Sequence, residues 1–239
     1  MAELGSMTAG LAHEIKNPLS TLGLNAQLLR EAVGDLPDDN PEKQRMGRRV
    51  DGIGREAERL RGILEDFLAY AGELRFELAR HDLGELTTEI SDFFLPQAER
   101  AGVRMRVSIA SPGDGLVAEV DASHTKQALL NLMLNAVQAM EGSGGSDREL
   151  ILRAERSKDS SGPGRVCVHV TDTGPGMDEE MQIRAFQPYQ SGRKGGTGLG
   201  LPTTRRLIEG QGGRLELHSE PGRGTAFTVS FDAAERSTA

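Results

Sequence analysis

Apolar residues recur at alternating steps of three and four along the first 75 positions of the chain. This spacing places them on one side of an α-helix, and it occurs in two successive segments. The first stripe consists of Leu11, Ile15, Leu19, Leu22, Ala26, Leu29 and Val33. The second, a heptad seam, consists of Val50, Ile53, Ala57, Leu60, Leu64, Phe67 and Ala71. Residues 34–41 are rich in helix breakers, so the pattern predicts a helical hairpin over residues 1–75.

Two helices alone cannot bury both stripes well. A hairpin of this kind usually pairs with a second copy of itself, so we expect a homodimer built around a four-helix bundle. A hairpin packed on the chain's own second domain is the alternative.

From Phe76 onward, helical periodicity alternates with the period-two pattern of strands. The predicted helices cover residues 83–100, about 123–140, 177–185 and about 202–211. The predicted strands cover residues 103–109, 116–120, 149–156, 165–172, 213–219 and 224–231. This order predicts an α/β two-layer sandwich over residues 76–232, and the whole chain is therefore of the α+β class. Residues 233–239 are expected to form a loose tail.

The chain has 239 residues, enough for one large or two modest domains, and a formal net charge of −8. A nucleic-acid-binding protein would usually carry a basic face, so we expect no nucleic-acid partner. No apolar run approaches the ~18 residues of a membrane span, and no secretory signal is visible. The single cysteine, Cys167, lies in a predicted strand and is interpreted as a buried, inert thiol. These features favour a cytoplasmic protein without membrane contact from this chain.

The first candidate for chemistry is the segment His13-Glu14-Ile15-Lys16-Asn17-Pro18-Leu19. His13 faces away from the apolar stripe, and Asn17 lies one turn further along the same face. Pro18 removes a backbone hydrogen bond and predicts a kink. An exposed His is most often a solvated surface residue, but a kinked polar cluster on a regular helix favours a nucleophile. With a pKa near 6.5, roughly three quarters of the imidazole is neutral at pH 7, so Glu14 would orient the ring rather than deprotonate it.

A row of amides, Gln127, Asn131 and Asn135, follows one side of the predicted helix 123–140, where many neighbouring positions are apolar. An unpaired buried amide costs ~1–3 kcal/mol, so these groups must find partners or face a wet cleft. An amide ladder against loop backbone is one interpretation. The other is a Mg²⁺ ion held by one carboxamide oxygen, with phosphates and waters completing its coordination.

Two glycine-containing segments follow. Asp172 ends a predicted strand and leads into Thr173-Gly174-Pro175-Gly176. One interpretation of this segment is an ordinary turn. The other is a nucleotide site, in which the Asp172 carboxylate accepts a hydrogen bond from an adenine amino group and the glycines let the base approach the backbone. Residues 192–200 hold five glycines and two cations just before a helix. They predict an anion-binding helix start beside a mobile lid, with a flexible linker as the alternative, and they lack the ending of a Walker loop.

These motifs, in this order, resemble those of the sensor histidine kinases of two-component systems. The segments 13–19 and 135–140 are most similar to the nitrogen-regulation type. The resemblance covers nearly the whole chain and implies a dimerisation and histidine-phosphotransfer hairpin. It also implies an ATP-binding domain of the kind shared with DNA gyrase, heat-shock chaperones and mismatch-repair ATPases.

In the hairpin, the resemblance makes His13 the phosphoacceptor, assisted by Glu14. Asn17 matches the position that orients water for dephosphorylation of the partner. The implied function is ATP-dependent autophosphorylation of His13 and transfer of the phosphoryl group to an aspartate of a response-regulator receiver domain, with phosphatase activity on that regulator.

In the second domain, the implied cofactors are ATP and Mg²⁺. Asn135 matches the magnesium ligand, Asn131 its companion, and Asp172 the carboxylate that recognises adenine. The other nucleotide-binding positions are Gly174, Gly176, Thr197, Gly198, Leu199 and Gly200.

The chain departs from the family pattern in two places. Many members carry Lys three residues after the magnesium Asn, where this chain has Gln138, so phosphate charge would rest more on Arg193 or Lys194. Only twelve residues precede His13, which leaves no room for an upstream sensor domain. We expect either a catalytic core cut from a longer protein or a signal that comes from another subunit.

Two other functions compete with the kinase. An ATP-driven conformational clamp would place Glu, as the base for water attack, where this chain has Asn131, and it would lack the His-Glu segment. The other is a non-catalytic scaffold, in which the hairpin dimerises and the second domain only binds nucleotide; the intact glycine loops and both Asn residues count against it. The sequence therefore favours the kinase.

Overall fold

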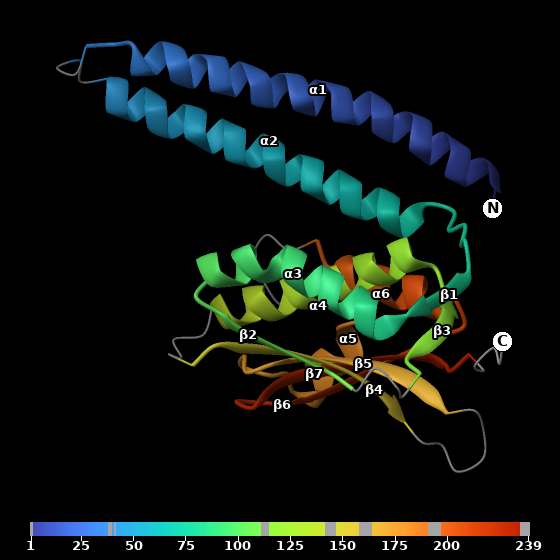
Figure 1. The fold of residues 1–239 in the computed structure, drawn as a ribbon. Helices are drawn as coiled ribbons and strands as arrows, with labels where there is room; N and C mark the ends of the chain where they lie inside the picture. Colours follow the sequence, from blue (N-terminus) through green and yellow to red (C-terminus); the bar gives the residue numbers. More distant parts are fainter. Residues whose placement is uncertain are drawn as a thin grey trace. The chain divides into compact units, whose positions relative to one another are not determined.

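A computed structural model of the chain describes residues 2–37, 40, 42–110, 115–141, 147–157, 164–190 and 197–234, with the backbone alone for residues 2–14 and 16. The chain folds as two compact units: the first comprises the described residues up to Glu73 together with Thr197, and the second comprises the other described residues from Leu74 onward. The first is helical, and the second combines helices with two sheets (Figure 1).

The first unit is a hairpin of α1 (Ala2–Gly34), which continues through Pro18, and α2 (Lys43–Ala71). Its buried side chains recur every seventh residue along each helix: Leu19, Ala26, Val33, Val50 and Ala57. Stripe residues between them stay exposed, namely Leu22 (49%), Leu29 (52%), Ile53 (51%) and Leu60 (41%). The predicted stripe therefore divides into a half that is buried within the hairpin and a half that the single hairpin leaves in solvent.

The second unit is built on a five-stranded sheet. Its order is β2 (Arg104–Ile109), β4 (Glu149–Ser157), β5 (Arg165–Asp172), β7 (Gly224–Asp232) and β6 (Arg214–Glu220). β2 and β4 are parallel, and the other neighbours are antiparallel. A smaller sheet pairs β1 (Ala79–Asp82) with β3 (Val117–Val120). β1 was not predicted, because its sequence Ala-Arg-His-Asp has no apolar alternation.

Three helices cover one face of the large sheet: α3 (Leu83–Arg100), α4 (Ala122–Glu141) and α6 (Gly200–Glu209) (Figure 1). Together with the sheet they enclose one core, whose largest fully buried side chains include Phe94, Leu129, Met133, Leu152 and Ile208. The short helix α5 (Glu179–Arg184) follows the loop after β5.

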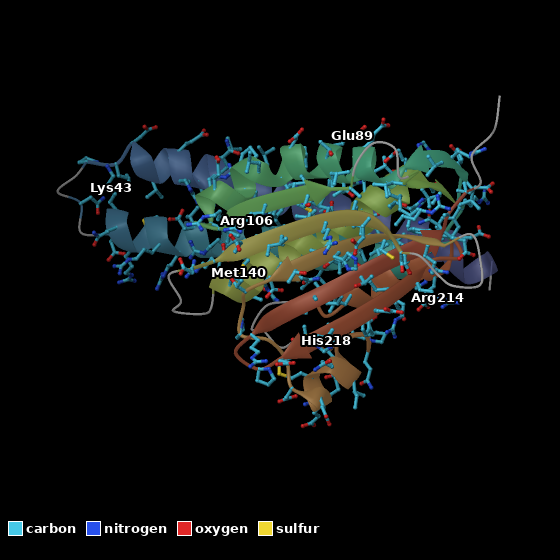
Figure 2. All side chains as sticks on the ribbon, turned by 60° about the horizontal axis from the view of Figure 1, so that its bottom comes forward. Lys43, Glu89, Arg106, Met140, Arg214 and His218 are labelled. Atoms are coloured by element: carbon cyan, nitrogen blue, oxygen red, sulfur yellow. The ribbon has the colours of Figure 1, made fainter. Side chains whose placement is uncertain are left out.

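The opposite face of the sheet is polar. In Figure 2 its strands lie in front of α3 and α4, and its two edge strands carry the labelled residues Arg106 on β2 and Arg214 and His218 on β6. The thiol of Cys167 on β5 is buried, and burial raises its pKa, in agreement with an inert thiol. No helix in the described part of the chain is long and apolar enough to cross a membrane.

The α+β class, with a helical hairpin followed by a helix-and-sheet unit, is confirmed. The elements predicted after Phe76 agree with the structure to within two residues at each end.

A buried carboxylate, Asp121, ties together three distant parts of the second unit. It accepts hydrogen bonds from the backbone N–H groups of Glu77 (2.9 Å) and His124 (2.9 Å), and its own N–H donates to Gln211 Oε1 (2.6 Å). Burial by itself would raise the pKa of Asp121, but these hydrogen bonds and the His124 ring outweigh it and hold the pKa at about 2. The segment before β1 is thereby anchored to the start of α4 and the end of α6.

Candidate functional site

The amides predicted on helix 123–140 lie on α4. Asn131 and Asn135 are half-buried, whereas their neighbours Leu132 and Met133 are fully buried in the core. Gln127, at the start of the row, is exposed. The two asparagines therefore lie at the border between the core and the solvent, where a carboxamide can reach a ligand without an uncompensated burial.

Asp172 is the last residue of β5 and is buried, with 4% of its surface exposed. Its Oδ1 accepts a hydrogen bond from the backbone N–H of Gly174 (2.8 Å), which turns the chain sharply after the strand. A Cβ at Gly174 would lie 2.7 Å from that oxygen and 3.5 Å from Ala139 Cβ on α4. A side chain at this position would therefore displace the Asp172 carboxylate, and the turn lies against the end of α4.

The second predicted glycine segment leads into α6. Gly198 has a φ of +67°, and its carbonyl accepts a hydrogen bond from the N–H of Tyr189 (3.2 Å). A Cβ at Gly198 would lie 2.6 Å from the Gln190 nitrogen, so a side chain is excluded there. Leu199 is buried, and a Cβ at Gly200 would lie 3.7 Å from Nδ2 of Asn135.

Helix α4 thus lies beside two of the predicted nucleotide segments. The start of α6 lies beside Asn135, and the Asp172–Gly174 turn lies beside Ala139. Asn135 and Ala139 are four positions apart on α4, which corresponds to about 6 Å along the helix axis. A carboxylate, a carboxamide and a helix N-terminus at this spacing can contact different parts of one nucleotide-sized ligand.

Some predicted residues are described only in part or not at all. The backbone of His13 and Glu14 lies in α1, but their side chains are outside the described residues. Asn17, one turn later, is exposed. Arg193 and Lys194 lie outside the described residues, so their predicted contact with phosphate stays a prediction. Thr197, which precedes Gly198, is half-buried.

The sequence motifs did not identify the turn between β6 and β7 as part of the site. This turn packs on the loop after Asp172. The N–H of Gly222 donates to the carbonyl of Pro175 (2.7 Å), and Met177 N–H donates to Ser219 Oγ (2.8 Å). The sequence Pro221-Gly222-Arg223-Gly224 between two predicted strands indicates a tight turn, but not what it contacts.

The chain matches known families over both units. Residues 3–72 match the His Kinase A (phospho-acceptor) domain, and residues 120–235 match the histidine kinase-, DNA gyrase B-, and HSP90-like ATPase family. The chain belongs to the sensor histidine kinases. Its resemblance to that family, predicted from the motifs, is confirmed.

Two curated relatives are similar to this histidine kinase core over nearly all of its length. It is 33% identical to the sensor histidine kinase ZraS of Klebsiella oxytoca over 228 residues, which are 95% of this chain and 46% of that protein. It is 31% identical to the sensory histidine kinase/phosphatase NtrB of Vibrio alginolyticus over 228 residues, covering 93% of this chain and 61% of that protein. The chain therefore spans less than two thirds of either relative.

Two crystal structures resemble the fold, and one of them is of the histidine kinase ThkA. Full-length ShkA in complex with AMPPNP superposes with a TM-score of 0.73 at 26% identity, over 97% of this chain and 46% of that one. ThkA in complex with the response regulator protein TrrA superposes with a TM-score of 0.63 at 26% identity, over 98% of this chain and 63% of that one.

Proposed function

We propose that this histidine kinase core binds ATP in its second unit, phosphorylates His13, and passes the phosphoryl group to an aspartate of a response-regulator receiver domain. The observation that carries the proposal is the convergence of Asp172, Asn135 and the 198–200 segment along α4 within the region that matches an ATPase family. The complex of ThkA with a response regulator supports the choice of partner.

In the nucleotide site, Asp172 accepts a hydrogen bond from the adenine amino group, and Asn131 and Asn135 face the phosphates. In the described part of the chain no three His, Cys, Asp or Glu side chains are grouped so that they could hold a metal by themselves. A Mg²⁺ ion suits this donor set only as a companion of ATP, held by phosphate oxygens, waters and the Asn135 carboxamide oxygen. When bound, it neutralises phosphate charge. We expect Arg193 or Lys194 to supply further positive charge for the phosphates.

At His13, the unprotonated ring nitrogen attacks the γ-phosphorus, the bond to the β–γ bridging oxygen breaks, and ADP leaves. Roughly three quarters of an unperturbed imidazole is already neutral at pH 7, so no base has to remove a proton first. Glu14 accepts from the other ring N–H and stabilises the positive charge that develops on the ring. A carboxylate oxygen of the regulator then attacks the phosphorus and releases His13.

The same helix face supports a reverse activity. Asn17 is exposed one turn from His13, so a receiver docked at His13 would present its phosphoaspartate near Asn17. A carboxamide can hold a water through both its donor and its acceptor without repelling the acyl phosphate. We therefore include phosphatase activity on the regulator in the proposal.

We further propose that residues 1–75 form the dimerisation and phosphotransfer domain and residues 76–232 the ATP-binding domain. Four exposed stripe residues, Leu22, Leu29, Ile53 and Leu60, support a homodimer, because a four-helix bundle would bury them. Burying each such side chain contributes about 1.5–3 kcal/mol. Sedimentation equilibrium tests the dimer: Leu22→Glu together with Ile53→Glu should give a folded monomer, and an unchanged mass would contradict it.

The kinase reaction is tested with γ-labelled ATP and Mg²⁺. The chain should acquire label that is acid-labile and alkali-stable, as expected for phosphohistidine. His13→Ala should acquire none, while its ATP affinity and melting temperature stay unchanged. His218→Ala is the matched control, because its side chain is 82% exposed on the other unit and it should label normally. Labelling of the His13 variant at the wild-type level would refute the assignment.

A further inference from the structure

Backbone of the β6–β7 turn, residues 220–224, lies against backbone of the segment 172–177, which we call the adenine loop. A Cβ at Gly176 would lie 1.9 Å from the Glu220 carbonyl oxygen, and one at Gly224 would lie 1.9 Å from the Asp172 carbonyl oxygen. Both glycines also have positive φ, +69° and +91°. No side chain fits at either position, so the two segments are held in direct backbone contact.

The hydroxyl of Ser219 lies at the centre of this contact. Ser219 is 7% exposed, and its Oγ accepts from the N–H of Met177 (2.8 Å) and donates to the carbonyl of Gly224 (2.8 Å). Thr225 Oγ1 lies 3.0 Å away. A hydroxyl has one proton to donate and two lone pairs, so Thr225 must be the donor in that pair. Every hydrogen-bonding position of Ser219 is then used between the turn and the adenine loop.

A second side chain holds the same point of the loop. Gln182 of α5 donates through Nε2 to the carbonyls of Met177 (3.1 Å) and Ser219 (2.9 Å). Met177 is thus fixed at its N–H by Ser219 and at its carbonyl by Gln182. Figure 2 labels His218, the residue that precedes Ser219 on β6.

We propose that Ser219 is a positioning residue for nucleotide binding: it fixes the far end of the adenine loop, as Asp172 fixes the near end through Gly174. The inference rests on the proposed ATP site. Ser219 makes its contacts with loop backbone and acts through it. Because the base must meet both the Asp172 carboxylate and the backbone beside it, a loop released at Met177 would present them in several arrangements, and ATP would bind more weakly.

The test uses the full chain and three variants. Ser219→Ala removes the hydroxyl, and Ser219→Thr restores it. Ser230→Ala is the matched control, because Ser230 is also a buried serine that hydrogen-bonds a side chain, Arg165 (3.1 Å). It lies six residues along β7 from Gly224, about 20 Å away. For each protein we would measure the melting temperature, hydrogen exchange at the Met177 amide without nucleotide, and the KM for MgATP and kcat of autophosphorylation.

In Ser219→Ala, exchange at Met177 should accelerate and the KM for MgATP should rise, each on the order of tenfold, with kcat within about twofold of wild type. Ser219→Thr should recover most of the wild-type KM. Ser230→Ala should change neither value, even if its melting temperature falls as far as that of Ser219→Ala.

Two results would overturn this inference and leave the proposed function intact. One is a Ser219→Ala variant whose KM for MgATP and Met177 hydrogen exchange equal those of the wild type. The other is a Ser230→Ala variant that shows the same rise in KM and in exchange as Ser219→Ala at an equal melting temperature. A wild-type chain that binds no MgATP would instead overturn the proposed function, and this inference with it.

Discussion

Replacing Asp172 by Asn should separate the proposed recognition of the nucleotide from folding. Asp172 is buried, and its Oδ1 accepts a hydrogen bond from the N–H of Gly174 at 2.8 Å. Asparagine is nearly the same shape and can keep an oxygen on that N–H. Its second polar group is then an NH₂, which faces the adenine amino group as another donor. Asp172→Asn should therefore keep the adenine loop and lose the contact with the base.

The expected loss of ATP affinity follows from the kind of hydrogen bond that Asp172→Asn removes. A hydrogen bond to a charged acceptor contributes about 1.5–3 kcal/mol, which corresponds to roughly a 10- to 150-fold weaker affinity for ATP. Asp172→Ala should lose a similar amount of affinity. It also leaves the Gly174 N–H without its acceptor and should lower the free energy of unfolding by about 1–3 kcal/mol.

The assay is calorimetric titration of each variant with MgATP, with thermal melting alongside. Asp178→Asn is the matched control, because Asp178 is an exposed carboxylate that caps α5 through Met181 N–H (2.8 Å) and takes no part in the proposed site. It should bind ATP as the wild type does. Wild-type affinity in Asp172→Asn, with its melting temperature unchanged, would refute the assignment of Asp172 to the base.

Three further predictions concern other parts of the chain. Asn17→Ala should autophosphorylate and transfer normally but leave a purified phospho-regulator phosphorylated longer in the presence of ADP; equal decay rates would return Asn17 to a structural role. The pKa of Asp121 falls on folding from 3.8 to about 2, which corresponds to about 2 kcal/mol. A lowered pKa stabilises the fold at pH values above the pKa of the unfolded chain. Denaturant titrations should therefore show Asp121→Asn less stable by that amount at pH 7, with the difference shrinking below pH ~4 and vanishing only below pH ~2. A pH-independent difference would contradict this linkage. Gly176→Ala should weaken ATP binding and lower the free energy of unfolding by well over the ~1–2 kcal/mol that a positive φ alone costs. Gly212→Ala is the control, because Gly212 has a φ of +79° but nothing within 4 Å of its added Cβ, so it should show only the cost of the positive φ. Equal losses of unfolding free energy in both variants would argue against the close contact at Gly176.

Local spacing was enough to predict most of the elements and the candidate residues. A period of 3.6 or 2 is a property of one segment, so α3, α4 and the strands of the large sheet could be predicted from their own residues. β1 could not, because it is a strand only through its pairing with β3, about 40 residues away, and carries no apolar alternation of its own. Asn135 stood out because a polar residue interrupts an apolar helix pattern, and Asp172 stood out because it ends a predicted strand directly before a glycine-rich turn.

The sequence by itself determined the family, the helical hairpin and the α+β class, and it predicted roles for Asp172, Asn135 and His13 that remain predictions. Only the tertiary structure decided which half of each apolar stripe is buried in the hairpin, because both halves have the same spacing. It also joined Met177 to Ser219, 42 residues apart, and Asp121 to Gln211, 90 residues apart. Neither pair follows from a local pattern, since each bond exists only where the packing of the sheet and helices brings its two segments within hydrogen-bonding distance.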